Sequence, residues 1–199
     1  MINQTKFNLP EFYSTLEETL ESAEKILIAA VGDAKTLFHT PVVSSFKDNQ
    51  ITSRVMVLRE FSLKDRKMRF HTDYRAAKIN HFNELSTASV LGYDPELKIQ
   101  IKLQGNISTH YDDEITKMAW DQSTPRSKKC YSVKGGSSKE IENPEDYDFK
   151  DFEVEEGYKN FSVLLFNFNS LEFLYLKSSG HRRAIHKWDE DYQSTWLVP

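Results

Sequence analysis

One stretch of strict alternation constrains this chain more than any other feature. From 97 to 107, apolar residues alternate with polar ones, as Leu97, Ile99, Ile101 and Leu103 against Lys98, Gln100, Lys102 and Gln104. A period of two residues is typical of a β-strand with one buried and one wet face. Other β-branched and aromatic runs occupy 37–46, 51–58, 68–72, 87–93, 160–167, 171–177 and 183–188, with a short end at 196–198. The chain is therefore predicted to be mainly β.

The connections between these runs are too short for a parallel sheet, which needs a long crossover for every pair of strands. About seven or eight strands in short meanders usually close into a barrel, since closure removes exposed edges. Helical spacing is confined to the segment from Pro10 to Gly32 and to 75–85 and 112–120. We therefore expect an antiparallel, Greek-key-like β-barrel with peripheral α-helices. It would form a single domain over 1–199, with an N-terminal helix within 1–33 and a loop insertion at 126–158.

Composition excludes several classes of protein. The 199 residues include 26 lysines and arginines against 30 acidic residues, a net charge of −4 that argues against bulk nucleic-acid binding. The longest apolar run, 26–31, is too short to cross a membrane, and the N-terminus lacks an apolar signal core. We therefore expect a cytoplasmic protein. Cys130 is the single cysteine, and His181 and His186 fall on opposite faces of a predicted strand, so no metal site is expected.

Two cations stand at the predicted start of the helix at 75–85. Thr72 or Asp73 can cap this helix, and Arg75 and Lys78 then share one face of its first turn. Cations at this point oppose the helix dipole unless an anion is also present. The segment is therefore a candidate phosphate site, the alternative being two solvated surface cations.

Two further arginines, Arg54 and Arg59, interrupt an otherwise apolar predicted strand. A central strand rarely carries two arginines unless they have anionic partners. Strand alternation predicts that they point to opposite faces and serve different groups. On the alternating strand, Gln100 offers a donor and an acceptor that suit the edge of a heterocycle, the alternative being an ordinary solvated face.

Five segments stand in an order and at spacings that together are specific. They are RVMVLR (54–59), MRFHTDYRAAK (68–78), QIKLQG (100–105), WDQSTPR (120–126) and the ending from HRR (181–183) to WLVP (196–199). From about Thr36 to Pro199, the chain resembles the pyridoxamine 5′-phosphate oxidase superfamily of FMN-binding split β-barrels.

The resemblance implies a homodimer with FMN at the subunit interface and a small-molecule substrate. Arg54 and Lys78, with Thr72 beside them, would bind the FMN phosphate, and Arg75 fits a variant of the same motif. Gln100 of the second subunit and Arg183 would reach the flavin ring, and Phe173 or Leu174 takes the place of a family tryptophan. The implied cofactor-binding set is Arg54, Val55, Met56, Val57, Leu58, Arg59, His71, Thr72, Arg75, Lys78, Gln100 and Arg183.

The departures from the family concern the substrate. Where the oxidases hold the substrate phosphate with lysine, tyrosine, arginine and serine, this chain has Arg59, Trp120, Thr124 and Lys128. Each lost charge-assisted hydrogen bond costs about 1.5–3 kcal/mol, so recognition of that phosphate is expected to be weak. The R-x-H pair near the C-terminus has no clean match in HRR (181–183). The residues retained as substrate contacts are Arg59, Trp120, Lys128 and Arg182.

The resulting prediction is an FMN-dependent oxidoreductase with an unassigned substrate and no identifiable general base. One alternative is a genuine pyridoxamine 5′-phosphate oxidase. Another is a non-enzymatic flavin- or haem-binding protein, in which His181 or His186 would ligate the iron, and a deazaflavin is a further possible ligand. A basic stretch at 126–139 followed by an acidic one at 140–156 is expected to form a loop over the substrate side of the flavin.

Overall fold

A computed structural model describes residues 7–147 and 154–199 of the chain. Its strands are β1 (Val42–Lys47), β2 (Gln50–Val55), β3 (Leu58–Ser62), β4 (Lys67–Asp73), β5 (Thr87–Asp94), β6 (Ile99–His110), β7 (Phe161–Tyr175), β8 (Arg182–Trp188) and β9 (Tyr192–Leu197). Its helices are α2 (Leu16–Gly32), α3 (Lys78–Glu84), α4 (Glu114–Asp121) and α5 (Pro125–Lys129), with 3-10 turns η1 (Leu37–His39), η2 (Pro144–Tyr147) and η3 (Val154–Asn160). The expected mainly β architecture with peripheral helices is confirmed.

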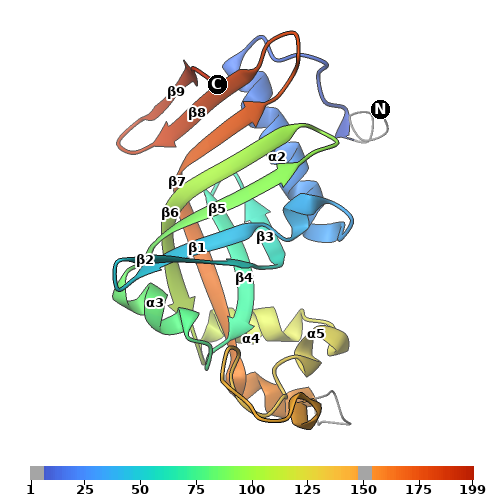
Figure 1. The fold of residues 1–199 in the computed structure, drawn as a ribbon, viewed down its shortest axis with the longest axis vertical. Helices are drawn as coiled ribbons and strands as arrows, with labels where there is room; N and C mark the ends of the chain where they lie inside the picture. The colour runs from blue at the N-terminus through green and yellow to red at the C-terminus, as the bar shows by residue number, and fades with distance from the viewer. Residues whose placement is uncertain (1–6, 148–153) are drawn as a thin grey trace.

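The nine strands form one antiparallel sheet, in the order β2-β1-β5-β6-β7-β4-β3, with β8 on β7 and β9 on β8. The two end strands of this path, β2 and β3, follow each other in the chain and are separated only by Met56 and Val57. The sheet must therefore curl until these two edges meet (Figure 1). No pairing among the described strands joins β2 to β3, so the barrel is split at this point, as the resemblance to split β-barrels implied.

Strand β7 connects the two ends of the molecule (Figure 1). Its 15 residues replace the two strands expected at 160–167 and 171–177. One half pairs with β4, the other half pairs with β8, and β6 runs beside both halves. Continuity of this strand was missed because Asn167, Asn169 and Ser170 resemble a turn in the sequence, although they lie at a bulge within the strand.

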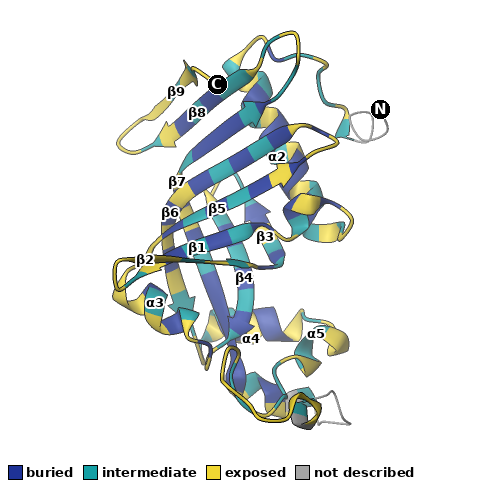
Figure 2. Cartoon of the chain, viewed as in Figure 1, coloured by how far each residue is buried: buried dark blue, intermediate teal, exposed yellow. Residues whose placement is uncertain are grey.

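Helix α2 covers one face of the upper part of the sheet. Its N-terminus has a capping box, in which Thr15 accepts a hydrogen bond from the backbone of Glu18 and the Glu18 carboxylate accepts one in return. The buried stripe of the helix, which includes Ile26 and Leu27, packs into the main core (Figure 2). Tyr13, just before the helix, meets Phe173 edge to face with ring centroids 4.9 Å apart. A smaller apolar cluster of Ala119, Trp120, Phe161 and Val163 lies at the far end.

Two other sequence expectations need correction. Residues 37–39 form the 3-10 turn η1 rather than a strand, because the Thr36 side chain caps this turn and Pro41 follows it. The predicted strand at 51–58 is interrupted at Met56 and Val57, between β2 and β3. The first correction affects only the entry to the sheet, whereas the second changes which side chains meet at the split.

Two histidines, the buried His186 and the partly buried His71, make the fold sensitive to acid. His186 on β8 is fully buried, and its ring nitrogens lie 2.9 Å from Thr19 Oγ1 and 2.9 Å from the Tyr192 hydroxyl. Burial lowers the pKa of His186 to about 4. Burial and the nearby Arg69 and Arg59 lower the pKa of His71 to about 3.

Because both histidines bind protons more readily when unfolded, the free energy of unfolding should fall as the pH drops below about 6.5. The expected slope is up to about 1.4 kcal/mol per pH unit for each histidine, with no loss above pH ~7. Denaturant titrations between pH 7.5 and 4.5 measure it, and His186→Gln should reduce the slope. An equal slope in wild type, His186→Gln and the exposed-site variant His181→Gln would contradict the assignment.

Two glycines should respond oppositely to alanine. A Cβ at Gly105 would collide with the backbone of Asn167 and Phe168, whereas a Cβ at Gly32, at the end of α2, would meet nothing within 4 Å. Gly105→Ala should therefore lower the free energy of unfolding by about 1–3 kcal/mol, while Gly32→Ala should leave it unchanged or raise it by up to about 1 kcal/mol. Equal effects in urea titrations would show that the β6–β7 contact is looser than described.

Candidate functional site

A cleft of about 650 Å³ opens at the split between β2 and β3. This volume lies within the range of small-molecule and cofactor sites. Its walls come from β2 and β3, the end of β4, the first turn of α3 and the loop after α5. The described residues that line it are Thr52, Ser53, Arg54, Val55, Met56, Val57, Arg59, His71, Thr72, Ala77, Lys78, His81, Cys130, Tyr131, Ser137 and Ser138.

Arg54 and Lys78 form a positive pole in this cleft. The Arg54 guanidinium donates to Ser45 Oγ at 2.9 Å and to Thr52 Oγ1 at 2.7 Å, and it lies 5.8 Å from the centre of the Phe82 ring. Lys78 Nζ donates to Thr72 Oγ1 at 3.2 Å. Neither side chain bonds to a carboxylate in the part of the chain that the structure describes. The positive charges of Arg54 and Lys78 are therefore available to an anionic ligand.

The charged side chains among the described residues that line the cleft are all basic. Burial lowers the pKa of Arg54, and burial together with the Arg54 charge lowers the pKa of Lys78. None of the described residues lining the cleft is acidic. Two close, partly desolvated cations without a carboxylate partner are unfavourable by themselves and are relieved by a phosphate dianion.

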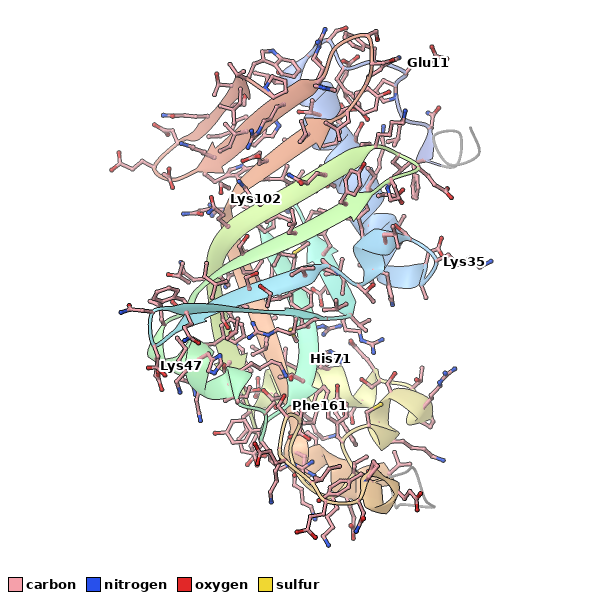
Figure 3. All side chains as sticks on the ribbon, viewed as in Figure 1. Glu11, Lys35, Lys47, His71, Lys102 and Phe161 are labelled. Carbon is pink, nitrogen blue, oxygen red and sulfur yellow. The ribbon has the colours of Figure 1, made fainter. Side chains whose placement is uncertain are left out.

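Arg59 and His71 form a second polar group on the same wall. The Nε of Arg59 and the Nε2 of His71 are both buried without a hydrogen-bond partner in the structure. Buried polar atoms rarely lack partners, and each such atom calls for an explanation. The His71 ring rests edge to face on Phe161, with centroids 4.9 Å apart (Figure 3). Arg59 Nε is a donor, and His71 Nε2 donates or accepts according to its tautomer, so the two fit a ligand that brings polar atoms into the cleft.

The sequence prediction that Arg54 and Arg59 serve opposite faces is wrong. Both line the same cleft, because the chain breaks its strand geometry at Met56 and Val57 between them. Alternation holds only within a continuous strand. The expected run along the cofactor, residues 55–58, lies at this break, and Val55, Met56 and Val57 line the cleft while Leu58 is buried in the core.

Arg75 has a different role from the one expected. Its guanidinium binds Asp73 at 2.6 and 3.0 Å and donates to the carbonyl of Val133 at 3.0 Å. Helix α3 begins only at Lys78, after Ala77 without a side-chain cap, so neither Thr72 nor Asp73 caps it. Arg75 therefore joins the end of β4 to the loop after α5 and does not line the cleft.

The loop after α5 forms the outer wall of the cleft. Cys130, which is exposed, Tyr131, Ser137 and Ser138 all reach the cleft. A Cβ at Gly136 would approach Arg75 Cβ to 2.7 Å and the Arg75 carbonyl oxygen to 2.8 Å, so this position requires glycine for close contact. Burial raises the pKa of Tyr131, which keeps its phenol a neutral hydrogen-bond donor.

Gln100 and Arg183 lie elsewhere on the molecule. Gln100 on β6, Leu174 on β7 and Arg183 on β8 are cross-strand neighbours in one row. Lys102, two residues from Gln100, lies far from His71 in Figure 3. The Arg183 guanidinium binds Glu172 Oε1 at 2.6 and 2.9 Å, and Lys102 Nζ binds the other carboxylate oxygen at 2.7 Å. Within one chain these residues do not reach the cleft.

The substrate candidates are also dispersed. Trp120 is only 2% exposed and packs against Tyr131, Tyr158 and Phe161, so it contributes to the small core. Lys128 lies 5.0 Å above the Trp120 ring, and Thr124 caps α5. Arg182 stacks on Phe12 at 3.9 Å and donates to the carbonyl of Tyr13 at 3.2 Å. Of the four candidates, only Arg59 lines the cleft.

The structure also bears on the haem alternative. His186 is fully buried with both ring nitrogens hydrogen-bonded, so it has no position open for iron. His181 accepts a hydrogen bond from the Lys177 amide through Nδ1 at 3.1 Å and lies in a separate pocket beside Trp196. The described residues hold no group of three or more histidine, cysteine or acidic side chains placed for a metal.

Within the described residues, no helix has the length and apolarity to cross a membrane.

Sequence reasoning missed one prominent residue of the cleft, His81. It lies one turn after Lys78 on α3, and its Nδ1 is 3.3 Å from Thr52 Oγ1 and 3.4 Å from Ser45 Oγ. The i, i+3 spacing from Lys78 was the available signal, since residues so spaced share a helix face. Tyr131 and the two serines gave no such signal, because their loop has no regular period.

The residues present fit FMN. The uncompensated pole of Arg54 and Lys78 suits its phosphate, the partnerless nitrogens of Arg59 and His71 suit polar atoms, and the volume suits a molecule of its size. Apolar side chains at Val55, Met56 and Val57 offer a surface for a flat ring.

Comparisons with known proteins agree with this fit. The profile of the pyridoxamine 5′-phosphate oxidase FMN-binding domain matches residues 14–111. A search of curated proteins finds no match. A pyridoxamine 5′-phosphate oxidase-related, FMN binding protein from Nostoc punctiforme is 16% identical with a TM-score of 0.75, over 94% of this chain and 100% of that one.

Two further solved structures have a similar fold. PhzG from Burkholderia lata is 20% identical with a TM-score of 0.66, over 92% of this chain and 90% of that one. A protein related to general stress protein 26 from Clostridium acetobutylicum is 12% identical with a TM-score of 0.54, over 85% and 95% of the two chains. Residues 14–111 thus match a domain that binds FMN, and the solved structures show that the chain has the fold of the pyridoxamine 5′-phosphate oxidase-like split barrels.

Proposed function

We propose that this chain is an FMN-dependent oxidoreductase that acts as a single split-barrel domain in a homodimer on a small-molecule substrate. The observation that carries the proposal is the cleft at the split, with Arg54, Lys78 and Arg59 in its walls and no described carboxylate. Bound FMN would supply the redox chemistry by exchanging electrons with the substrate at its ring. The protein would hold the cofactor and tune its surroundings.

Each wall of the cleft has a role in this proposal. Arg54 and Lys78 bind the phosphate, and the hydroxyls of Thr52 and Thr72 hold these cations in place. Arg59 donates its partnerless Nε–H to an acceptor of the cofactor or the substrate, and His71 Nε2 forms a hydrogen bond beside it. The loop residues Tyr131 and Ser137 limit the access of water from the outer side. No side chain is assigned as a general base.

The homodimer is proposed because part of one sheet face has no described helix over it. The row of Gln100, Leu174 and Arg183 lies on this part, opposite the face on which Tyr13, just before α2, packs against Phe173. Helix α4 covers the other end of the same face. The same face carries exposed apolar side chains on β2 and β5, including Ile51, Val55 and Tyr93. A second copy covering it would bring Gln100 and Arg183 to a flavin that the first copy holds. Exposed apolar side chains on an uncovered sheet face favour burial against a second copy.

The substrate is proposed to differ from pyridoxamine 5′-phosphate. Trp120 is in the core, Thr124 caps a helix and Lys128 covers Trp120, so these three positions do not form a phosphate site in the cleft. The similarly folded PhzG was solved in complex with tetrahydrophenazine-1-carboxylic acid, so this architecture also accommodates other ring compounds.

The double variant Arg54→Ala/Lys78→Ala tests the cofactor site. Removing both cations should cost at least two charge-assisted hydrogen bonds, about 3–6 kcal/mol, and so lower FMN affinity by at least about 100-fold. Flavin content after purification and titration of FMN fluorescence measure the effect. The exposed pair Lys35→Ala/Lys64→Ala is the control and should retain FMN. Undiminished flavin in the first variant would place the phosphate elsewhere.

Mixing subunits tests the shared site. Gln100→Ala/Arg183→Ala should weaken FMN binding, as should Arg54→Ala/Lys78→Ala, but a mixed dimer would contain one site free of substitutions. About half of the dimers should be mixed, and one of the two sites in each mixed dimer carries no substitution. Co-expression should therefore restore up to about a quarter of the wild-type sites. No recovery in verified mixed dimers would mean that each site belongs to a single chain.

Turnover assays separate the candidate functions. FMN-loaded protein should oxidise pyridoxamine 5′-phosphate at a kcat/KM at least about 100-fold below that of a genuine oxidase measured in parallel, given the missing contacts. Reduction of the bound flavin by NADH or NADPH would support an oxidoreductase that takes electrons from a nicotinamide. Efficient oxidation of pyridoxamine 5′-phosphate would overturn the proposed substrate difference.

A further inference from the structure

His81 stands next to the positive pole through a network of hydroxyl groups. Its Nδ1 lies within 3.3 Å of Thr52 Oγ1 and 3.4 Å of Ser45 Oγ, and Arg54 donates to both of these oxygens. Arg54, Lys78 and His81 thus meet at one end of the cleft, from β2 and from one face of α3.

The hydrogen bonds place His81 Nδ1 in the hydroxyl network that holds Arg54. Ser45 Oγ and Thr52 Oγ1 are 3.0 Å apart, so one of these hydroxyls donates to the other. In either tautomer of neutral His81, Nδ1 shares a hydrogen with these hydroxyls. The ring can gain a second proton from solvent if a nearby anion stabilises the resulting charge.

The charges around His81 oppose this gain in the free protein. Burial, then Lys47 and Arg54, lower the pKa of His81, while Glu84 and Asp48 act in the opposite direction. Lys47 on β1 and Glu84 on α3 form an ion pair at 3.5 Å, so their effects partly cancel. The uncompensated cations that remain are Arg54 on β2 and, one turn before His81, Lys78.

We infer that His81 is a third phosphate-binding residue of this cleft and takes up a proton from solvent when the phosphate of FMN binds. The inference rests on the proposed function, since it takes the anion at the Arg54–Lys78 pole to be the FMN phosphate. A dianion there reverses the local field that disfavours imidazolium. By linkage, the contribution of His81 to FMN affinity should then increase as the pH falls.

Titrations of FMN and riboflavin into cofactor-free protein test the inference. The ratio of the FMN Kd in His81→Gln to that in wild type should be about 5 at pH 5.5 and approach 1 at pH 8.5, the size expected for a partly exposed charge pair. The second ionisation of the FMN phosphate, with a pKa near 6, affects every variant alike and cancels in this ratio. Riboflavin, which lacks the phosphate, should show no pH dependence in the same ratio.

Two more variants make the test decisive. His81→Arg carries a permanent charge, so it should bind FMN as tightly as wild type at low pH and remove the His81-dependent change with pH. His181→Gln, at the other end of the molecule, should match wild type at every pH. Calorimetry in two buffers with different ionisation enthalpies should show proton uptake that is smaller in His81→Gln than in wild type.

The outcomes separate this inference from the proposed function. A ratio of Kd values that stays constant from pH 5.5 to 8.5 would overturn the role of His81, provided that FMN binds more tightly than riboflavin. Equal binding of FMN and riboflavin by the wild type would instead overturn the phosphate pole on which the proposed function rests. Thermal melts of each variant check that the fold is retained.

Discussion

The break in the sheet at Met56 and Val57 is the constraint on which the rest of the site depends. It joins the two edge strands β2 and β3 through a two-residue link, so the sheet curls but leaves a split. Arg54 and Arg59 stand on either side of this break and line the same cleft. In a continuous strand they would face apart. The cations remain without carboxylate partners among the described residues, and the cost of holding them together is offset once an anion binds.

The two faces of the sheet have different roles, one in the core and one at the proposed dimer interface. On one face, α2 buries Ile26 and Leu27 and is tied to β8 through the bond between Thr19 and His186. The opposite face carries Gln100, Lys102 and Arg183, with Glu172 holding the last two in place, and α4 packs on this face at the other end of β7. Glu172 is buried while the side chains of Lys102 and Arg183 are partly exposed, so the two ion pairs fix the positions of both cations at the surface of the sheet. A fixed Arg183 on an uncovered face is what a shared cofactor site requires.

Much of this arrangement could be predicted from the sequence. The alternation from 97 to 107 identified β6, and the order of short motifs indicated the FMN-binding domain that residues 14–111 match. The break at 56–57 could not be predicted, because Met56 and Val57 are ordinary strand residues and only the closure of the sheet forces the interruption. Arg75 was misassigned because the competing partner, Asp73, lies two residues away, and contacts to Val133 depend on a loop without a period. Trp120 was misassigned because homologous position alone does not reveal burial.

A crystal structure of the protein grown with FMN tests the central claim most directly. The account predicts the phosphate within hydrogen-bond distance of Arg54 Nη and Lys78 Nζ, with the ring along residues 55–57 and Gln100 and Arg183 of a second copy near its edge. A phosphate bound away from the split, for example in the pocket beside His181 and Trp196, would contradict it. So would a flavin held entirely by one chain.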